Sequence, residues 1–142
     1  KEHKDRWYVI AKELNDDVIK SFALDRLTNL EISKIRYVAV EFNIEDYFKH
    51  CFGIIRPLDE KPEEVLLSFD SHQAKYIKSL PLHESQKIIS ENENETVIKL
   101  NVYLTHDFLM EILSYGETVK ILKPQILIDE LKSSFAAALK HY

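Results

Sequence analysis

The sequence predicts an α+β protein in two unequal parts. Three observations support this: short alternating segments at the start, a charged stretch with two prolines near the middle, and a regular succession of strand and helix patterns after it. The chain has 142 residues, of which 45% are hydrophobic and 11% aromatic, so it can bury a core. We expect residues 1–54 to form the first part, residues 55–61 a linker, and residues 62–142 the second part.

The first part begins with a predicted hairpin. Residues 6–13 and 18–24 alternate between apolar and polar side chains, and the polar turn LNDD at 14–17 joins them. Alternation sorts the first of these strands into two faces. The face expected in the core carries Trp7, Val9 and Ala11, and the opposite face carries Arg6, Tyr8, Ile10 and Lys12.

Two further elements are predicted before the linker. Residues 29–34 are expected to form a third strand. A short helix should follow, because Asn43 is a suitable N-cap and Gly53 is a suitable residue just past its end.

The second part follows the order strand, helix, strand, strand, helix, strand, with one added helix. Strands are predicted over residues 65–69, 86–91, 96–104 and 118–122, and helices over about 70–80 and 105–116 and from Pro124 onwards. The apolar face of the last helix carries Leu127, Leu131, Phe135, Ala138 and Tyr142. This order is the split β-α-β pattern of ferredoxin-like domains, so we expect residues 62–142 to fold on their own.

Charge and targeting signals narrow the class of protein. The net charge is −5, but residues 1–36 carry 8 Lys and Arg against 7 Asp and Glu, whereas the other 106 residues carry 11 against 17. Any anion site is therefore expected in the first third of the chain. No signal peptide or membrane-spanning pattern occurs, so a cytoplasmic protein is expected. The absence of an initial methionine suggests a piece of a longer protein.

Catalytic and metal-binding motifs are not found in the sequence. The single cysteine, Cys51, excludes an internal disulfide and a multi-cysteine zinc site. There is no glycine-rich phosphate loop, His-Glu-x-x-His or Gly-x-Ser-x-Gly motif. His83 and Ser85 have side chains suited to acid–base chemistry, but no partner spacing supports that role, and a polar loop is expected. We expect neither enzymatic activity nor a cofactor.

Six segments in order resemble a WYL domain followed by its C-terminal extension, the WCX domain. They are RWYVIA at 6–11, KSFALDRL at 20–27, FNIEDYFKHCFGI at 42–54, LHESQ at 82–86, LSYGETVKILKP at 113–124, and a final helix ending in Tyr142. The resemblance covers nearly the whole chain. It implies a partial Sm/SH3-like β-barrel before the ferredoxin-like part, and an origin in a bacterial helix-turn-helix transcriptional regulator.

The resemblance also implies a function and a site. In such regulators the WYL domain senses an effector, here expected to be a nucleotide or a single-stranded nucleic acid, and DNA is contacted only through a helix-turn-helix domain that this chain lacks. The residues expected to bind the effector are Arg6, Tyr8, Lys20 and Arg26. Two departures weaken this basic pocket, because Lys20 replaces an arginine and Ala23 replaces a second basic residue.

Other interpretations remain open for several of these residues. Trp7 is expected in the core, and Tyr8 either packs or stacks on a base. Arg26 either binds the ligand or pairs with Asp25 or Asp17. The whole chain is either a sensor or a structural dimerisation module without a ligand. In both cases a homodimer is expected, because the barrel strands supplied here leave an unpaired edge.

Overall fold

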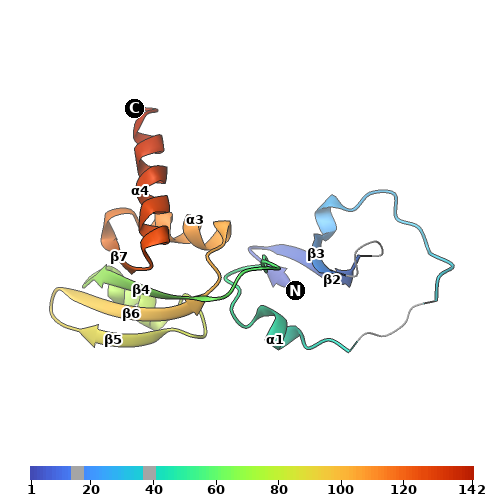
Figure 1. Ribbon diagram of the computed structural model, residues 1–142, viewed down its shortest axis with the longest axis horizontal. Coiled ribbons are helices and arrows are strands. Elements are labelled where there is room, and N and C mark those ends of the chain that lie inside the picture. Colours follow the sequence, from blue (N-terminus) through green and yellow to red (C-terminus); the bar gives the residue numbers. More distant parts are fainter. Residues whose placement is uncertain (14–17, 37–40) are drawn as a thin grey trace.

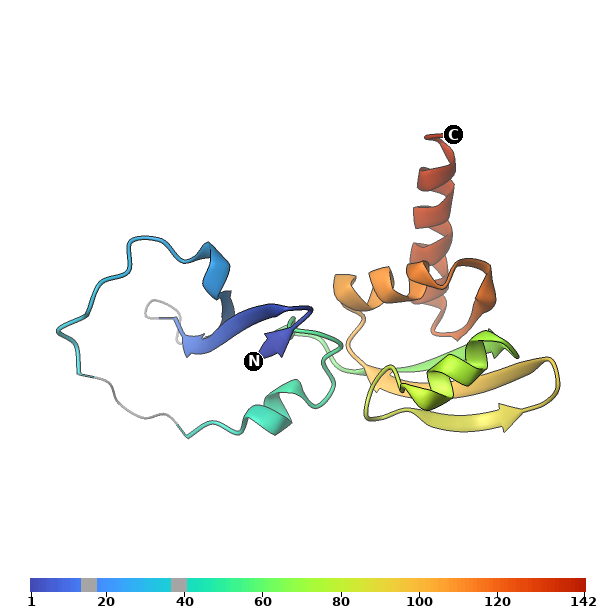
Figure 2. The ribbon, with the colours of Figure 1, turned by 180° about the vertical axis from the view of Figure 1, so that it is seen from behind.

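The computed structural model describes residues 1–13, 18–36 and 41–142. Within these residues there are two antiparallel sheets, of three and four strands, and four α-helices (Figure 1). The mixed α+β class predicted from the sequence is therefore confirmed. Seen from both sides, the three-stranded sheet and helix α1 lie beside the four-stranded sheet and the other helices (Figure 2).

The first sheet has the strand order β1-β2-β3. Its strands are β1 (Glu2–His3), β2 (Arg6–Lys12) and β3 (Ile19–Ala23). Lys4 and Asp5 connect β1 to β2 with φ angles of 50° and 62°, the conformation that a tight two-residue hairpin turn requires. The two predicted strands of the hairpin are present, and the predicted turn at 14–17 lies outside the described residues.

The buried face of β2 is the opposite of the expected one. Trp7 is 63% exposed and Val9 44%, whereas Tyr8 and Ile10 are half-buried. The reason lies in what covers the sheet. The Tyr8 face includes Ser21, whose hydroxyl donates a hydrogen bond of 3.3 Å to the carbonyl oxygen of Ile54, so the segment after α1 packs on that side. The prediction that Trp7 belongs to the core is wrong.

The predicted third strand at 29–34 is also wrong. After the 3-10 turn η1 (Leu24–Arg26), residues 27–36 contain no strand. Leu30, Ile32 and Ile35 are exposed, and Ile32 is 100% exposed. Apolar alternation favours a strand only where a neighbouring strand can accept its backbone hydrogen bonds, and in the described part of the chain no strand pairs with this segment.

Helix α1 (Ile44–Phe48) is shorter than predicted. Its predicted N-cap is confirmed, because the Asn43 side chain accepts hydrogen bonds from the backbone N–H groups of Glu45 and Asp46 at 3.0 and 3.2 Å. The helix ends at Phe48, and the chain then turns toward the second part. Gly53 has a φ of +89°, a conformation that favours glycine.

The second part contains the predicted succession of strands and helices. Its elements are β4 (Glu63–Asp70), α2 (Gln73–Ser79), β5 (Lys87–Glu91), β6 (Glu95–Val102), α3 (His106–Ser114), the 3-10 turn η2 (Gly116–Thr118), β7 (Val119–Lys123) and α4 (Gln125–Leu139). The strand order is β5-β6-β4-β7, and every neighbouring pair is antiparallel. As predicted, Thr105 caps α3, where its hydroxyl accepts the backbone N–H of Phe108 at 3.4 Å.

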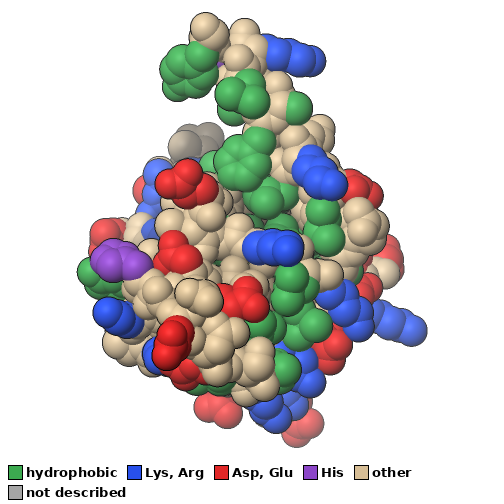
Figure 3. All heavy atoms as spheres, turned by 90° about the vertical axis from the view of Figure 1, so that its left-hand side faces the viewer, with side chains coloured by type: hydrophobic (Ala, Val, Ile, Leu, Met, Phe, Trp, Pro, Cys, Tyr) green, Lys and Arg blue, Asp and Glu red, His purple; other side chains and the backbone are tan. Residues whose placement is uncertain are grey.

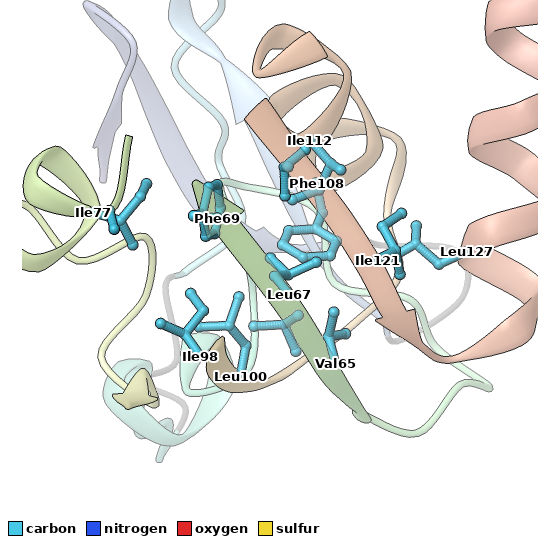
Figure 4. Close-up of a cluster of buried hydrophobic side chains, with 13 residues drawn as sticks. Val65, Leu67, Phe69, Ile77, Ile98, Leu100, Phe108, Ile112, Ile121 and Leu127 are labelled. Atoms are coloured by element: carbon cyan, nitrogen blue, oxygen red, sulfur yellow. The ribbon is translucent and has the colours of Figure 1, made fainter. Parts of the chain in front are cut away.

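The core lies between one face of this sheet and the helices (Figure 4). The register pairs Val65 with Leu100 and Leu67 with Ile98, so these four side chains share a face. All four are fully buried, as are side chains from α3 and α4. The members contributed by helices are Ala74, Ile77, Phe108, Ile112 and Leu127.

Helix α4 extends beyond the domain that it covers (Figure 1). Of its predicted apolar face, Leu127 is buried and Leu131 is half-buried, but the side chains from Phe135 to Tyr142 are exposed. Figure 3 shows hydrophobic side chains along this projecting end. Among the described residues, no helix has both the length and the apolar character needed to cross a membrane.

Candidate functional site

The structure separates two of the four residues expected to bind the effector. In the β2–β3 register Tyr8 pairs with Ala23, whereas Ala11 pairs with Lys20. Paired residues point to the same face of a sheet, and residues an odd number of positions apart in one strand point to opposite faces. Tyr8 and Ala11 are three positions apart, so Tyr8 and Lys20 lie on opposite faces of the hairpin. Lys20 also forms an ion pair with Glu13 near the far end of the hairpin. The expectation of one strand face that carries both Tyr8 and Lys20 is wrong.

The other basic residues lie at the opposite end of the hairpin. Arg6 begins β2, and Arg26 ends the 3-10 turn that follows β3. The guanidinium Nε of Arg6 is 4.0 Å from Oδ2 of Asp25, and both side chains are about half exposed. Asp25 was one of two expected partners of Arg26; the other, Asp17, lies outside the described residues. This end of the hairpin, defined by Arg6, Trp7, Tyr8 and Arg26, is called the arginine end below.

Trp7 is a candidate that the sequence reasoning missed. Its ring is on the open face of β2 at the arginine end, directly between Arg6 and Tyr8 in sequence. A tryptophan exposed to 63% is unusual, because this side chain is normally largely buried. The signal available in the sequence was the incomplete barrel, because a hairpin with few neighbouring strands has less of its surface covered.

A second group of aromatic rings surrounds α1. Tyr47 contacts Phe42 and Phe48 edge to face, with ring centroids 5.1 and 4.8 Å apart. Two of these rings form cation–π contacts within the chain. Arg56 lies 4.6 Å from the centre of the Tyr47 ring, and Lys1 lies 4.5 Å from the centre of the Phe48 ring. Burial raises the pKa of Tyr47 although Arg56 lowers it, so the phenol stays neutral at physiological pH.

A cavity of about 610 Å³ opens between α1 and the loop at 82–86. Its lining consists of Glu45, Asp46, Phe48, Lys49, Cys51, His83 and Glu84. Three carboxylates against one lysine give it the wrong charge for a phosphate group. A nucleotide or nucleic-acid effector therefore does not fit this cavity, and the arginine end is the better candidate.

His83 and Ser85 do form a polar loop, which bonds to Asn101 of β6, and Asn101 in turn bonds to the first part of the chain. Nδ1 of His83 accepts the backbone N–H of Ser85 at 3.1 Å and lies 2.8 Å from its hydroxyl oxygen. That oxygen accepts the backbone N–H of Asn101, in β6, at 2.9 Å. Nδ1 of His50 lies 3.1 Å from the carbonyl oxygen of Asn101, and the carbonyl of His50 accepts the N–H of Tyr103 at 2.9 Å.

The cysteine and the possible metal ligands are the remaining reactive groups to place. Cys51 is buried and its thiol donates to the carbonyl oxygen of Tyr47 at 3.7 Å. Burial raises the pKa of Cys51, which disfavours the reactive thiolate. In the part of the chain that the structure describes, no three His, Cys, Asp or Glu side chains lie close enough together to hold a metal ion.

The fold is α+β, with a three-stranded sheet followed by a four-stranded sheet and its helices. The family model of the WCX domain matches residues 61–139, which is more than half of the chain. The chain therefore belongs to the WCX domain family, which suggests a regulatory domain of the kind associated with WYL domains. A comparison with curated proteins finds no match.

Proposed function

We propose that this chain is the effector-sensing regulatory part of a bacterial transcriptional regulator, and that it has no enzymatic activity. Its membership of the WCX family supports a regulatory role. The resemblance of residues 6–54 to a WYL domain supports an effector-binding role for the first part, built as a portion of an Sm-like barrel. In the parent regulator a separate helix-turn-helix domain would contact DNA, in keeping with a cytoplasmic location.

We also propose a ferredoxin-like fold for the second part. The succession β4-α2-β5-β6-α3-β7 and the antiparallel order β5-β6-β4-β7 support this assignment. In that fold each helix connects two parallel strands with a third strand between them. Here β6 lies between β5 and β4, which α2 connects.

The proposed effector is a nucleotide or a short single-stranded nucleic acid, bound at the arginine end. The observation that carries this proposal is the exposed ring of Trp7 at the end of the hairpin where Arg6 and Arg26 also lie. An exposed aromatic ring stacks on bases of any sequence, and guanidinium groups bind phosphate oxygens in two-point contacts. Lys20 shares the face of Trp7, but it lies near the other end of the hairpin, where it pairs with Glu13, so it is not part of this proposed site.

Because Trp7 is the only tryptophan, its fluorescence can report binding directly. Titration of the full chain with a short oligothymidylate, and separately with nucleotides, should quench that fluorescence. The double variant Arg6→Ala/Arg26→Ala should weaken oligonucleotide binding and reduce the slope of log affinity against log salt by about 1.4, since each contact to a single strand contributes about 0.7.

A matched control removes the same charge elsewhere. The double variant Lys75→Ala/Lys87→Ala changes two exposed lysines of the second part and should leave the salt slope unchanged. Equal loss of affinity in both double variants would mean that only net charge matters. No quenching by either kind of probe would remove the arginine end as the site.

A second candidate function is dimerisation without a ligand, with a second copy of this chain as the partner. The observation in its favour is the exposed apolar segment after η1, where Leu30, Ile32 and Ile35 have no described partner layer. Light scattering of the full chain at tens of micromolar should then show a dimer that Leu30→Glu/Ile32→Glu dissociates. Ile88→Glu/Ile89→Glu on β5 is the control, and a monomeric unmodified chain would exclude this function.

A further inference from the structure

The two histidines of the network between the loop at 82–86 and β6 have opposite hydrogen-bonding roles. His50 faces a carbonyl oxygen, which only accepts, so its Nδ1 must carry a proton and can keep the bond when the ring is charged. His83 faces the backbone N–H of Ser85, which only donates, so Nδ1 of His83 must be unprotonated. Of the two histidines, therefore, only His83 would lose its hydrogen bonds on protonation of its ring.

We propose that His83 is a proton-operated latch that fastens the loop to β6 and, through Asn101, to the first part of the chain. In the closed state the neutral ring accepts the N–H of Ser85, and the Ser85 hydroxyl donates to Nδ1 at 2.8 Å in preference to the carbonyl oxygen of Asn101 at 3.5 Å. This orients the hydroxyl oxygen to accept the N–H of Asn101. Protonation at Nδ1 places a donor against the backbone N–H of Ser85, which can only donate, so the ring turns away from Ser85, its hydroxyl is no longer held in this orientation, and the latch opens.

The groups around His83 can accommodate both the neutral and the protonated ring. Burial of the ring lowers the pKa of His83, Glu84 raises it and His50 lowers it, with burial the largest of the three effects. A neutral ring is therefore favoured near neutral pH. Once charged, the ring can turn into the cavity, where Glu84 and, from α1, Glu45 and Asp46 provide carboxylates beside the one cation Lys49. A switch needs such an alternative partner in its second state.

Opening of the latch should release only the His83 end of the loop. The far end of the loop is tied independently, because the Gln86 side chain accepts the N–H of Leu82 and donates to the carbonyl of Ile77, both at 2.9 Å. The Asn101 amide is the first group released. The contact next to it, from the N–H of Tyr103 to the carbonyl of His50, joins the two parts of the chain, so acid should loosen their junction.

Amide hydrogen exchange of the full chain, measured by NMR at about pH 7.5 and about pH 5, tests this latch. After correction for the intrinsic pH dependence of exchange, the Asn101 amide should lose protection about three- to tenfold in acid, as expected when one hydrogen bond is lost. The amide of Ile98, in the middle of the same strand, should keep its protection. Equal protection of Asn101 at both pH values would overturn the proposal.

Three variants separate the latch from general effects of acid. His83→Asn keeps an acceptor near the position of Nδ1 but does not titrate, so Asn101 should stay protected at both pH values. Ser85→Ala should leave Asn101 unprotected at both. His141→Asn, which changes an exposed histidine beyond α4, should behave as the unmodified chain. A His83→Asn chain that retained the pH dependence would assign it to another group and refute the latch.

Discussion

Phe52 and Phe108 meet edge to face, with their ring centroids 5.4 Å apart, and this contact joins the two parts of the chain. Phe108 is fully buried in the core of the second part, whereas Phe52 precedes the residues that match the WCX model. A residue outside the matched range therefore helps to cover the core of the WCX domain.

Replacing Phe52 with alanine should therefore destabilise the second part as well as the first. The side chain is half-buried, so the loss should be smaller than the roughly 3–5 kcal/mol typical of a fully buried phenylalanine. Urea unfolding at equilibrium would measure it. Phe42→Ala, which removes a more exposed ring near α1, is the control and should cost less. Equal losses in the two variants would mean that the contact with Phe108 has no special weight.

Residues 62–142 should fold cooperatively when produced alone, because their core is built from their own strands and helices. Their melting temperature should be below that of the full chain, since Phe52 is missing. Circular dichroism during heating would measure both quantities. A broad, non-cooperative transition would show that the first part is needed for the second to fold.

Burial should decide how much it costs to truncate a leucine in the four-stranded sheet. Leu67→Ala removes a fully buried side chain and should cost about 2–5 kcal/mol of the free energy of unfolding. Leu122→Ala, in β7 of the same sheet, changes an exposed leucine and should cost far less. Chemical denaturation of both variants gives the comparison, and a similar cost at both positions would contradict the location of the core.

The two glycines differ in the space around them. A Cβ atom at Gly53 would lie 3.0 Å from Oδ2 of Asp107 and 3.0 Å from Nε2 of His3, whereas Gly116 has open space. Both have positive φ, so alanine should cost about 1–2 kcal/mol at Gly116 and more at Gly53. Urea unfolding of the two alanine variants tests this order, and its reversal would exclude close packing at Gly53.

Tyr115 should make the protein sensitive to alkali. Burial and the hydrogen bond that it donates to Glu111, 2.8 Å long, raise its pKa above the ordinary value near 10. The unfolded chain then loses this proton first, so stability should be complete below about pH 10 and fall as the pH rises further. Denaturation at several pH values should show a smaller fall for Tyr115→Phe, and an identical fall would assign the effect to other tyrosines.

The sequence predicts a structural element correctly where the residues that stabilise the element are its near neighbours in the chain. The caps at Asn43 and Thr105 and the order of elements in the second part were predicted correctly, because capping and alternation depend on nearby residues. The relative placement of Tyr8 and Lys20 could not be predicted in the same way. It depends on the register of the hairpin, which places them on opposite faces.

The sequence by itself determined that β2 has two faces, that residues 62–142 contain a self-sufficient apolar pattern, and that basic residues gather in the first third. Only the tertiary structure decided that the Tyr8 face is covered and Trp7 is exposed, that residues 29–34 pair with nothing described, and that His83 reaches β6 through Ser85. The physical reason is that alternation defines the faces of a strand, whereas burial depends on which distant segment packs against one of them.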